Sequence, residues 1–208
     1  MRITAKNLSK RFNREWIFKD LNYQFNAPGT FAITGPNGSG KSTLLQVLWG
    51  QMVPSAGSII YESNELEILQ SDFFKYISIA TPYMDLIDEF TLLEMVKFHF
   101  SFKEIRDNKS IDEVIDNFGL NHARDKPISN FSSGMRQRLK LGLAFYSKNH
   151  ALFLDEPTTN LDRKAIDWYV EHLNGIPADT LIFIASNQEH EYPVNAHKID
   201  ILTYKKGY

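Results

Sequence analysis

The 208-residue chain has no cysteine, which excludes disulfide bonds, thiolate metal sites and a cysteine nucleophile. It lacks the uninterrupted apolar run of about 20 residues that a helix needs to span a bilayer, and its first residues, MRITAK, contain no apolar signal-peptide core. It also carries little net charge, −2 at pH 7 with a pI near 6.3, so no basic field argues for nucleic acid. We therefore expect a soluble cytosolic protein, with no nucleic-acid partner, that would reach a membrane only through another protein.

The composition that is present, 43% hydrophobic and 23% charged residues, is that of an ordinary globular chain. At this length we expect one domain, or one domain with an inserted lobe. Short apolar or alternating runs predict β-strands. The predicted strands cover residues 3–8, 21–25, 30–34, 58–61, 77–80, 151–155, 181–185 and 199–203.

The stretch 91–148 is instead rich in helical patterns. Thr91 followed by Glu94 resembles a capping box that opens a helix, and Ser132 or Ser133 can cap another helix after the break at Pro127. The sequence thus predicts an α/β fold. It has a P-loop core at residues 1–80 and 149–208, an N-terminal antiparallel β part, and a helical lobe at residues 88–148.

Residues 35–42, GPNGSGKS, fill every fixed position of the phosphate-binding pattern G-x-x-x-x-G-K-[ST]. Glycines let the backbone curl so that N–H groups point at an anion. Lys41 can then reach the β- and γ-phosphates, and the Ser42 hydroxyl is placed to ligate Mg²⁺. A predicted helix at 42–49 adds its positive N-terminal end. The sequence predicts a nucleoside triphosphate bound by Gly35, Pro36, Asn37, Gly38, Ser39, Gly40, Lys41, Ser42 and Thr43, against the alternative of a glycine-rich turn that binds nothing.

Residues 151–157, ALFLDEP, are an apolar strand followed by two carboxylates. In a P-loop fold the carboxyl edge of this strand faces the nucleotide. Asp155 can hold Mg²⁺, and Glu156 can accept a proton from an attacking water. The alternative is a pair of solvated acids that ends a strand.

Residues 131–139, FSSGMRQRL, offer a hydroxyl, a glycine backbone and a helix N-terminus, which together can grip a phosphate. Because the P-loop already holds the chain's own phosphates, we expect Ser132, Ser133 and Gly134 to be presented to the nucleotide of a second subunit. Taken alone, the segment would be an ordinary serine-capped helix.

In this order the three motifs resemble the ATP-binding-cassette (ABC) ATPases over essentially the whole chain. Residues 131–137 are similar to the signature loop L-S-G-G-Q, with Phe131, Ser133 and Met135 as departures. Residues 159–162, TNLD, resemble the D-loop, whose acidic position, here Asp162, organises the dimer interface. The resemblance implies ATP and Mg²⁺ as ligands and ATP hydrolysis as the activity.

Residues 8–12, LSKRF, resemble the segment whose aromatic residue stacks on adenine. Phe12 is the first candidate for that role and Trp16 the second, and packing into the core is the alternative for both. A stacked aromatic reads the identity of a base poorly, so weak base specificity is expected.

Two positions depart from the family pattern. No glutamine lies between Gln70 and Gln137, so the joint between core and lobe, expected at residues 81–83, lacks the family's glutamine; only Thr81 or Tyr83 offers a hydroxyl there. The switch histidine is replaced by Asn187, whose amide can donate to a γ-phosphate but cannot carry charge.

Near Asn187, His190 is a poor substitute and Gln188 could reach the site. Because Lys41, Ser42, Asp155 and Glu156 are all present, we expect slow hydrolysis rather than none.

The resemblance implies the nucleotide-binding subunit of a transporter, which forms a homodimer or a cassette heterodimer on ATP and drives an integral-membrane subunit at the inner face of the cell membrane. A repair-type ATPase would need a coiled coil before the signature, and a translation factor would need two P-loops. A small haem-exporter-like type and a lipid or drug exporter stay open. So do a non-transport ABC ATPase and a nucleotide-gated regulatory or binding module with little hydrolysis. An apolar cluster after the joint would receive the membrane partner or pack in the lobe: Tyr83, Met84, Leu86, Ile87 and Phe90.

Overall fold

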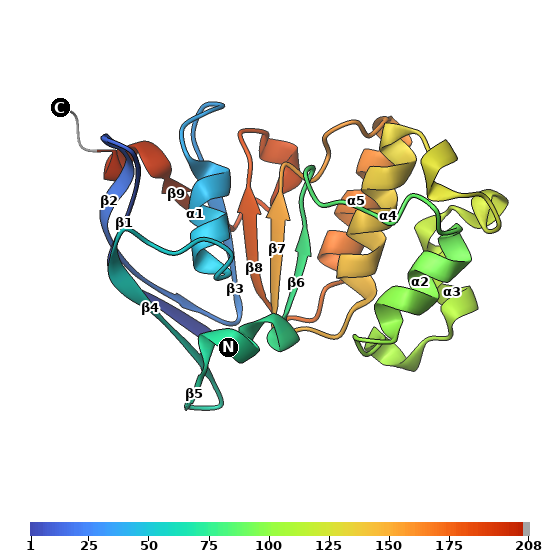
Figure 1. The fold of residues 1–208 in the computed structure, drawn as a ribbon, viewed down its shortest axis with the longest axis horizontal. Coiled ribbons are helices and arrows are strands. Elements are labelled where there is room, and N and C mark those ends of the chain that lie inside the picture. Colours follow the sequence, from blue (N-terminus) through green and yellow to red (C-terminus); the bar gives the residue numbers. More distant parts are fainter. Residues whose placement is uncertain (206–208) are drawn as a thin grey trace. The chain divides into compact units, whose positions relative to one another are not determined.

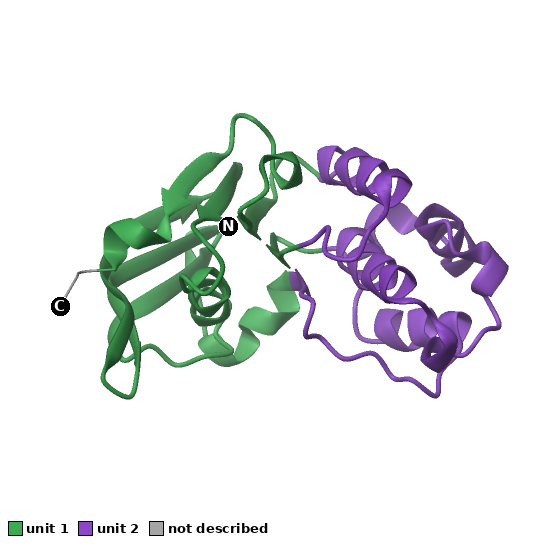
Figure 2. Cartoon of the chain, turned by 90° about the horizontal axis from the view of Figure 1, so that it is seen from above, with its two compact units in different colours: residues 1–77, 149–156, 177–208 green, residues 78–148, 157–176 purple. Residues whose placement is uncertain are grey.

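The computed structural model describes residues 1–205, which form two compact units (Figure 2). Of the described residues, unit 1 contains 1–77, 149–156 and 177–205, and unit 2 contains 78–148 and 157–176. Strand β6 (Ile77–Ala80) runs from the first unit into the second. The sequence-based division stays a prediction; the structure groups residues 157–176, expected in the core, with the helical residues.

Unit 1 is built on two sets of strands (Figure 1). The antiparallel sheet has the order β2-β1-β4-β5, and the parallel strands follow one another in the order β7-β8-β3-β9. Its elements are β1 (Arg2–Phe12), β2 (Glu15–Asn26), β3 (Gly29–Thr34), α1 (Lys41–Leu48), β4 (Ala56–Ser63), β5 (Leu66–Ile68), β7 (Ala151–Asp155), β8 (Leu181–Ala185) and β9 (His197–Asp200), with 3₁₀ helices at Gln70–Tyr76, Glu189–Glu191 and Ile201–Tyr204.

The core of unit 1 is apolar and aromatic. Every residue of β7 and β8 is buried, which explains the unbroken apolar runs at 151–154 and 181–185. Phe153 of β7 stacks on Phe183 of β8 with ring centroids 4.7 Å apart. Helix α1 packs against β7 and β8 on one side and β1 on the other, so it lies inside unit 1.

Three predicted strands, 77–80, 151–155 and 181–185, have these bounds in the structure, and the two N-terminal strands are longer than expected. Of the strand predicted at 199–203, only residues 199 and 200 lie in a strand, so its C-terminal end is wrong. Strand β9 ends at Asp200, whose carboxylate accepts a hydrogen bond from the Leu202 backbone N–H at 2.9 Å, and residues 201–204 turn into a 3₁₀ helix. The short acidic side chain offers the backbone a partner that competes with the β-ladder.

Unit 2 is helical. Its elements are α2 (Leu92–Phe100), α3 (Ile111–Phe118), α4 (Ser133–Tyr146) and α5 (Arg163–Asn174), with 3₁₀ helices at Arg106–Asn108, Asn121–Ala123 and Ile128–Asn130. The predicted capping box is confirmed: Thr91 Oγ1 accepts from the Glu94 N–H, and Glu94 Oε2 accepts from the Thr91 N–H.

Helices α3 and α4 approach closely at Gly142, where an added Cβ would come within 2.5 Å of the Phe118 ring. Within residues 1–205 no helix is both long and apolar enough to cross a membrane.

Candidate functional site

The predicted catalytic residues of unit 1 meet at one edge of the parallel strands. In the ladder, Asp155 of β7 lies opposite Ala185 of β8, which lies opposite Ile33 of β3. The Glu156 N–H donates to Ala185 O at 2.9 Å, and the Ser186 N–H donates to Ile33 O at 3.1 Å. Because all these strands are parallel, the segments that leave their carboxyl ends converge, as expected for a nucleotide site of this fold.

The loop between β3 and α1 has the backbone of an anion cradle. Gly35, Gly38 and Gly40 have φ values of 142°, 75° and 111°, a region that side chains disfavour. At Gly40 an added Cβ would also lie 2.3 Å from Ile17 Cγ2. Ser39 Oγ is buried and has no hydrogen-bond partner within residues 1–205, so it is available to a phosphate oxygen. The loop therefore fits a bound polyphosphate.

Lys41, the first residue of α1, is nearly buried and folds back over the loop. Its Nζ donates to Gly35 O at 3.1 Å and to Pro36 O at 3.3 Å. An ammonium group held only by neutral carbonyls keeps its full attraction for phosphate. Thr43, the remaining predicted contact, follows on α1 and is half-buried.

The predicted metal pair is in contact: the Ser42 hydroxyl donates to Asp155 Oδ1 at 2.9 Å. Burial raises the pKa of Asp155 to about 6; the Ser42 hydrogen bond and Lys41 oppose that rise, whereas Glu156 and Glu191 add to it. Such a buried acid gains from a nearby cation. Residues 1–205 contain no group of three or more His, Cys, Asp or Glu side chains that could hold a metal alone. The pair therefore fits Mg²⁺ bound jointly with phosphate oxygens and water.

Glu156 and Asn187 complete this edge. Glu156 has a φ of 42°, an uncommon conformation for a side chain other than glycine and typical of strained functional positions. Asn187 is exposed, and its Nδ2 donates to Oδ1 of the P-loop residue Asn37 at 3.2 Å. The switch position and the P-loop are thus within hydrogen-bonding distance of each other.

The two adenine candidates lie on the hairpin of β1 and β2, with Phe12 opposite Glu15 and Trp16 opposite Arg11. Ile17, the next residue, is the one that faces Gly40. Phe12 is 45% exposed, whereas Trp16 is half-buried with Arg11 and Lys19 each 5.5 Å from its ring. The hairpin tip therefore lies beside the P-loop, and the more accessible ring is that of Phe12.

In unit 2 the predicted signature loop and D-loop line one hollow of about 340 Å³. Ser132 caps α4 by accepting from the Met135 N–H at 3.2 Å, and Asp162 caps α5 by accepting from the Ala165 N–H at 2.8 Å. An added Cβ on Gly134 would lie 3.0 Å from Asn160 O, so the two loops touch. Ser132, Ser133 and Gly134 thus form one surface with Asp162.

The two hydroxyl-bearing residues at the joint, Thr81 and Tyr83, differ in their exposure to solvent. Thr81 is buried, and its carbonyl accepts from Lys140 Nζ at 3.4 Å, whereas Tyr83 is 85% exposed.

Three residues near these sites were missed by sequence reasoning. Glu191 is 1% exposed and acts electrostatically on Asp155. Arg138 lines the hollow, its guanidinium 4.7 Å from the Trp168 ring, and burial lowers its pKa. Lys140 is buried on α4. What distinguishes Glu191 and Lys140 is that they are charged and buried, which is rare. Their burial is not visible in the sequence, so no sequence signal marks them.

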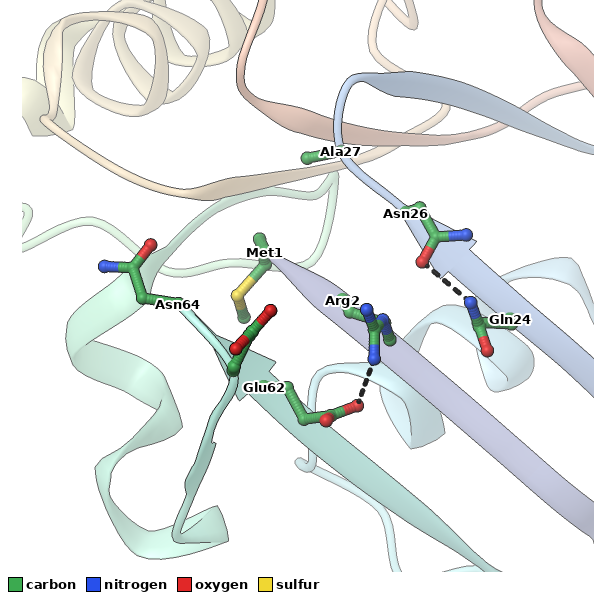
Figure 3. Close-up of a pocket in the computed structure, with 8 residues that line it drawn as sticks. Met1, Arg2, Gln24, Asn26, Ala27, Glu62 and Asn64 are labelled. Atoms are coloured by element: carbon green, nitrogen blue, oxygen red, sulfur yellow. Dashed lines mark hydrogen bonds and ion pairs between the residues drawn. The ribbon is translucent and has the colours of Figure 1, made fainter.

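A second hollow, of about 390 Å³, lies at one end of the antiparallel sheet (Figure 3). Its polar lining includes the Arg2–Glu62 ion pair at 3.5 Å and the hydrogen bond from Gln24 to Asn26 at 3.0 Å. It contains none of the predicted site residues.

The fold and the carboxyl-edge site define a P-loop nucleotide-binding protein. Residues 18–159 match the family model described as ABC transporter. The chain therefore belongs to the ABC transporter family, as an ATP-binding subunit of a family that hydrolyses ATP.

Relatives and solved structures agree. The chain is 31% identical over 164 residues to the uncharacterized ABC transporter ATP-binding protein YybJ of Bacillus subtilis, covering 79% of this chain and 75% of the relative. It is 30% identical over 200 residues to the spermidine/putrescine import ATP-binding protein PotA of Fusobacterium nucleatum, covering 93% of this chain but only 53% of the relative. It is 28% identical to the lantibiotic transport ATP-binding protein SrtF of Streptococcus pyogenes, covering 89% and 79%.

The chain thus spans about half the length of the PotA relative. Among solved structures, a putative ABC transporter ATP-binding protein from Pyrococcus furiosus superposes with a TM-score of 0.81 at 17% identity over 99% of this chain and all of the other. A bacterial ABC transporter cassette solved as a dimer gives 0.75 at 20% identity over 89% of this chain and 88% of the other. These likenesses establish the fold.

Proposed function

We propose that this chain binds and slowly hydrolyses ATP as one cassette of a two-cassette transporter, and that closure of the pair on ATP drives a separate integral-membrane subunit. The observation that carries the proposal is the meeting of the P-loop, the Ser42–Asp155 pair and Glu156 at one sheet edge. This set has separate groups for the phosphates, the metal and the proton.

The chemistry follows from those groups. Backbone N–H groups of the loop and the Ser39 hydroxyl receive phosphate oxygens, and Lys41 exchanges two neutral carbonyls for the β- and γ-phosphates. Ser42 and Asp155 would hold Mg²⁺, which supplies charge neutralisation between the phosphates. Glu156 accepts the proton of the attacking water.

The second half of the active site would come from another cassette. Ser132, Ser133 and Gly134 surround the N-terminus of α4, a 14-residue helix that favours an anion, and Asp162 lies beside them. The relative solved as a dimer supports such an arrangement. Homodimer and heterodimer are distinguished by whether the purified chain pairs with itself.

The segment after β6 is suited to receive the membrane partner. Tyr83 is 85% exposed and Met84, Leu86 and Ile87 are half-buried. Phe90 stands edge-on to Phe98 at 5.5 Å, and Phe98, 42% exposed, continues the apolar surface. The protein would then work at the inner face of the cell membrane.

Transport subunits among the relatives support this role. Their names span polyamine import and lantibiotic transport, so direction and cargo would be set by the membrane subunit. The haem-exporter-like subtype stays a prediction from the sequence.

Slow turnover is proposed because two positioning groups are replaced. One N–H of the Asn187 amide donates to Asn37, the second is left to donate to the γ-phosphate, and the group carries no charge. At the joint, Thr81 is buried and Tyr83 is exposed, and neither side chain carries the amide group of a glutamine. The same replacements favour a second candidate, a nucleotide-gated binding module with little hydrolysis.

The test is steady-state ATPase of the purified chain with Mg²⁺, beside ATP-dependent dimerisation by size-exclusion chromatography with light scattering. We expect slow turnover and an ATP-dependent dimer, and in Glu156→Gln a dimer that persists without turnover. Lys41→Ala, the control, should lose ATP binding. A Glu156→Gln variant that hydrolyses ATP at the parent rate would refute the assignment of the base, and a dimer without turnover in the parent would favour the binding module.

A further inference from the structure

Helix α4 carries two cations on one face that both reach the segment 81–90. Lys140 and Arg136 are four residues apart, so they lie one above the other on the helix. Lys140 Nζ donates to Pro82 O at 2.7 Å and to Thr81 O at 3.4 Å, and Arg136 Nη1 pairs with Asp88 Oδ1 at 2.5 Å. The two contacts hold both ends of the segment.

Lys140 is 8% exposed, which is unusual for lysine. Burying an ammonium is costly, and here burial lowers its pKa, with Asp85 opposing and Arg136 adding to the effect. An apolar residue could fill the same space at lower cost, whereas an ammonium specifies where the two carbonyls lie. Lys140 is therefore better suited to fixing a geometry than to adding stability.

The remaining hydrogen bonds of the segment attach it to the same lobe. The Ser129 N–H donates to Asp88 O at 2.9 Å, and the Ile128 N–H donates to Phe90 O at 2.8 Å. On another side of α4, Gln137 Nε2 donates to Pro157 O at 2.9 Å. Pro157 directly follows Glu156, so the helix also holds the chain next to the proposed base.

We propose that Lys140 and Arg136 are positioning residues that clasp segment 81–90 to α4, so that the segment and the phosphate-gripping residues at the helix N-terminus move as one body. The inference rests on the proposed two-cassette ATPase. It assigns to this clasp the link between the surface offered to the membrane partner and Ser132.

The test compares Lys140→Met and Asp88→Asn with Lys148→Met, which removes an exposed ion pair of the same unit with Glu104 at 2.7 Å. Both clasp variants should lose about 2- to 30-fold in kcat and in ATP-dependent dimerisation, while the affinity of the monomer for a fluorescent ATP analogue stays unchanged. The control should match the parent. The reversed pair, Asp88→Arg with Arg136→Asp, should recover most of the loss in Asp88→Asn.

The outcomes separate the two proposals. If the parent binds no ATP, or shows neither turnover nor an ATP-dependent dimer, the proposed function itself is refuted. An active parent with both clasp variants at its kcat would overturn the clasp alone, as would an equal loss in Lys148→Met. If Lys140→Met does not fold, the result for Asp88→Asn alone tests the clasp. The Asp88 side chain is 52% exposed, so this substitution leaves the core intact.

Discussion

Acid should destabilise unit 2 through one histidine. Burial lowers the pKa of His99 to about 4, and Lys103 adds to the effect. Its Nε2 lies 2.8 Å from Ser147 Oγ, and that hydroxyl gives its single hydrogen to Leu143 O at 2.7 Å. Nε2 must therefore donate to Ser147, which leaves Nδ1 as the nitrogen that a proton would have to charge inside the lobe.

The size of the effect follows from linkage. Below pH 6.5 the unfolded chain takes up a proton that folded His99 refuses until about pH 4, so the free energy of unfolding falls as the pH drops through this window. A shift from 6.5 to about 4 corresponds to about 2 kcal/mol at pH 5. Because His99 is partly exposed, we expect about 1–2 kcal/mol.

The assay is urea unfolding at pH 7.5 and pH 5.0, followed by tryptophan fluorescence and circular dichroism. Protonation of His99 should lower the urea midpoint of the parent by about 0.5 M between the two pH values. The variant His99→Gln keeps a donor toward Ser147, and its midpoint should lack this fall of about 0.5 M. His150→Gln, an exposed histidine of unit 1, is the matched control and should behave like the parent. An equal drop in His99→Gln and the parent would refute the reasoning.

Three further predictions concern the nucleotide site. Gly40→Ala puts a Cβ 2.3 Å from Ile17 at a φ of 111° and should weaken ATP binding about 10-fold or more by calorimetry; parent-like affinity would contradict the cradle geometry. Phe12→Ala should cost about 1–3 kcal/mol of ATP binding while Trp16→Ala costs little, and the reverse order would assign adenine to Trp16. Asn187→His should raise steady-state kcat by up to about 10²-fold, and no gain would show that the switch position does not limit turnover.

The candidate residues of unit 1 could be proposed from the sequence because they lie in short local patterns. Short, continuous apolar runs such as 151–154 and 181–185 are typical of strands covered on both faces, and both segments are strands in the structure. The end of β9 failed because Asp200 offers a cap that a periodicity argument ignores. Hydrophobic pattern locates strands, whereas side-chain hydrogen bonds decide where they stop.

What could not be predicted depends on contacts between distant positions. Lys140 and Pro82 are 58 residues apart, and neither has a neighbourhood that distinguishes it from a solvated lysine or an ordinary turn. The same holds for Glu191, whose burial next to Asp155 follows from the turn after β8 and not from its own sequence context.

The P-loop glycines and the buried cation Lys140 differ in what makes each residue suitable for its position. Gly35, Gly38 and Gly40 have positive φ values that strongly favour glycine, so the loop can be recognised from its sequence pattern. A buried cation such as Lys140 is tolerated only because particular carbonyls turn toward it, and its cost is recovered as specificity of position. The motifs therefore define which reaction the chain can catalyse. The hydrogen bonds of Lys140 to the segment 81–90 depend on the fold instead, and we expect their loss to slow turnover without changing the affinity of the monomer for ATP.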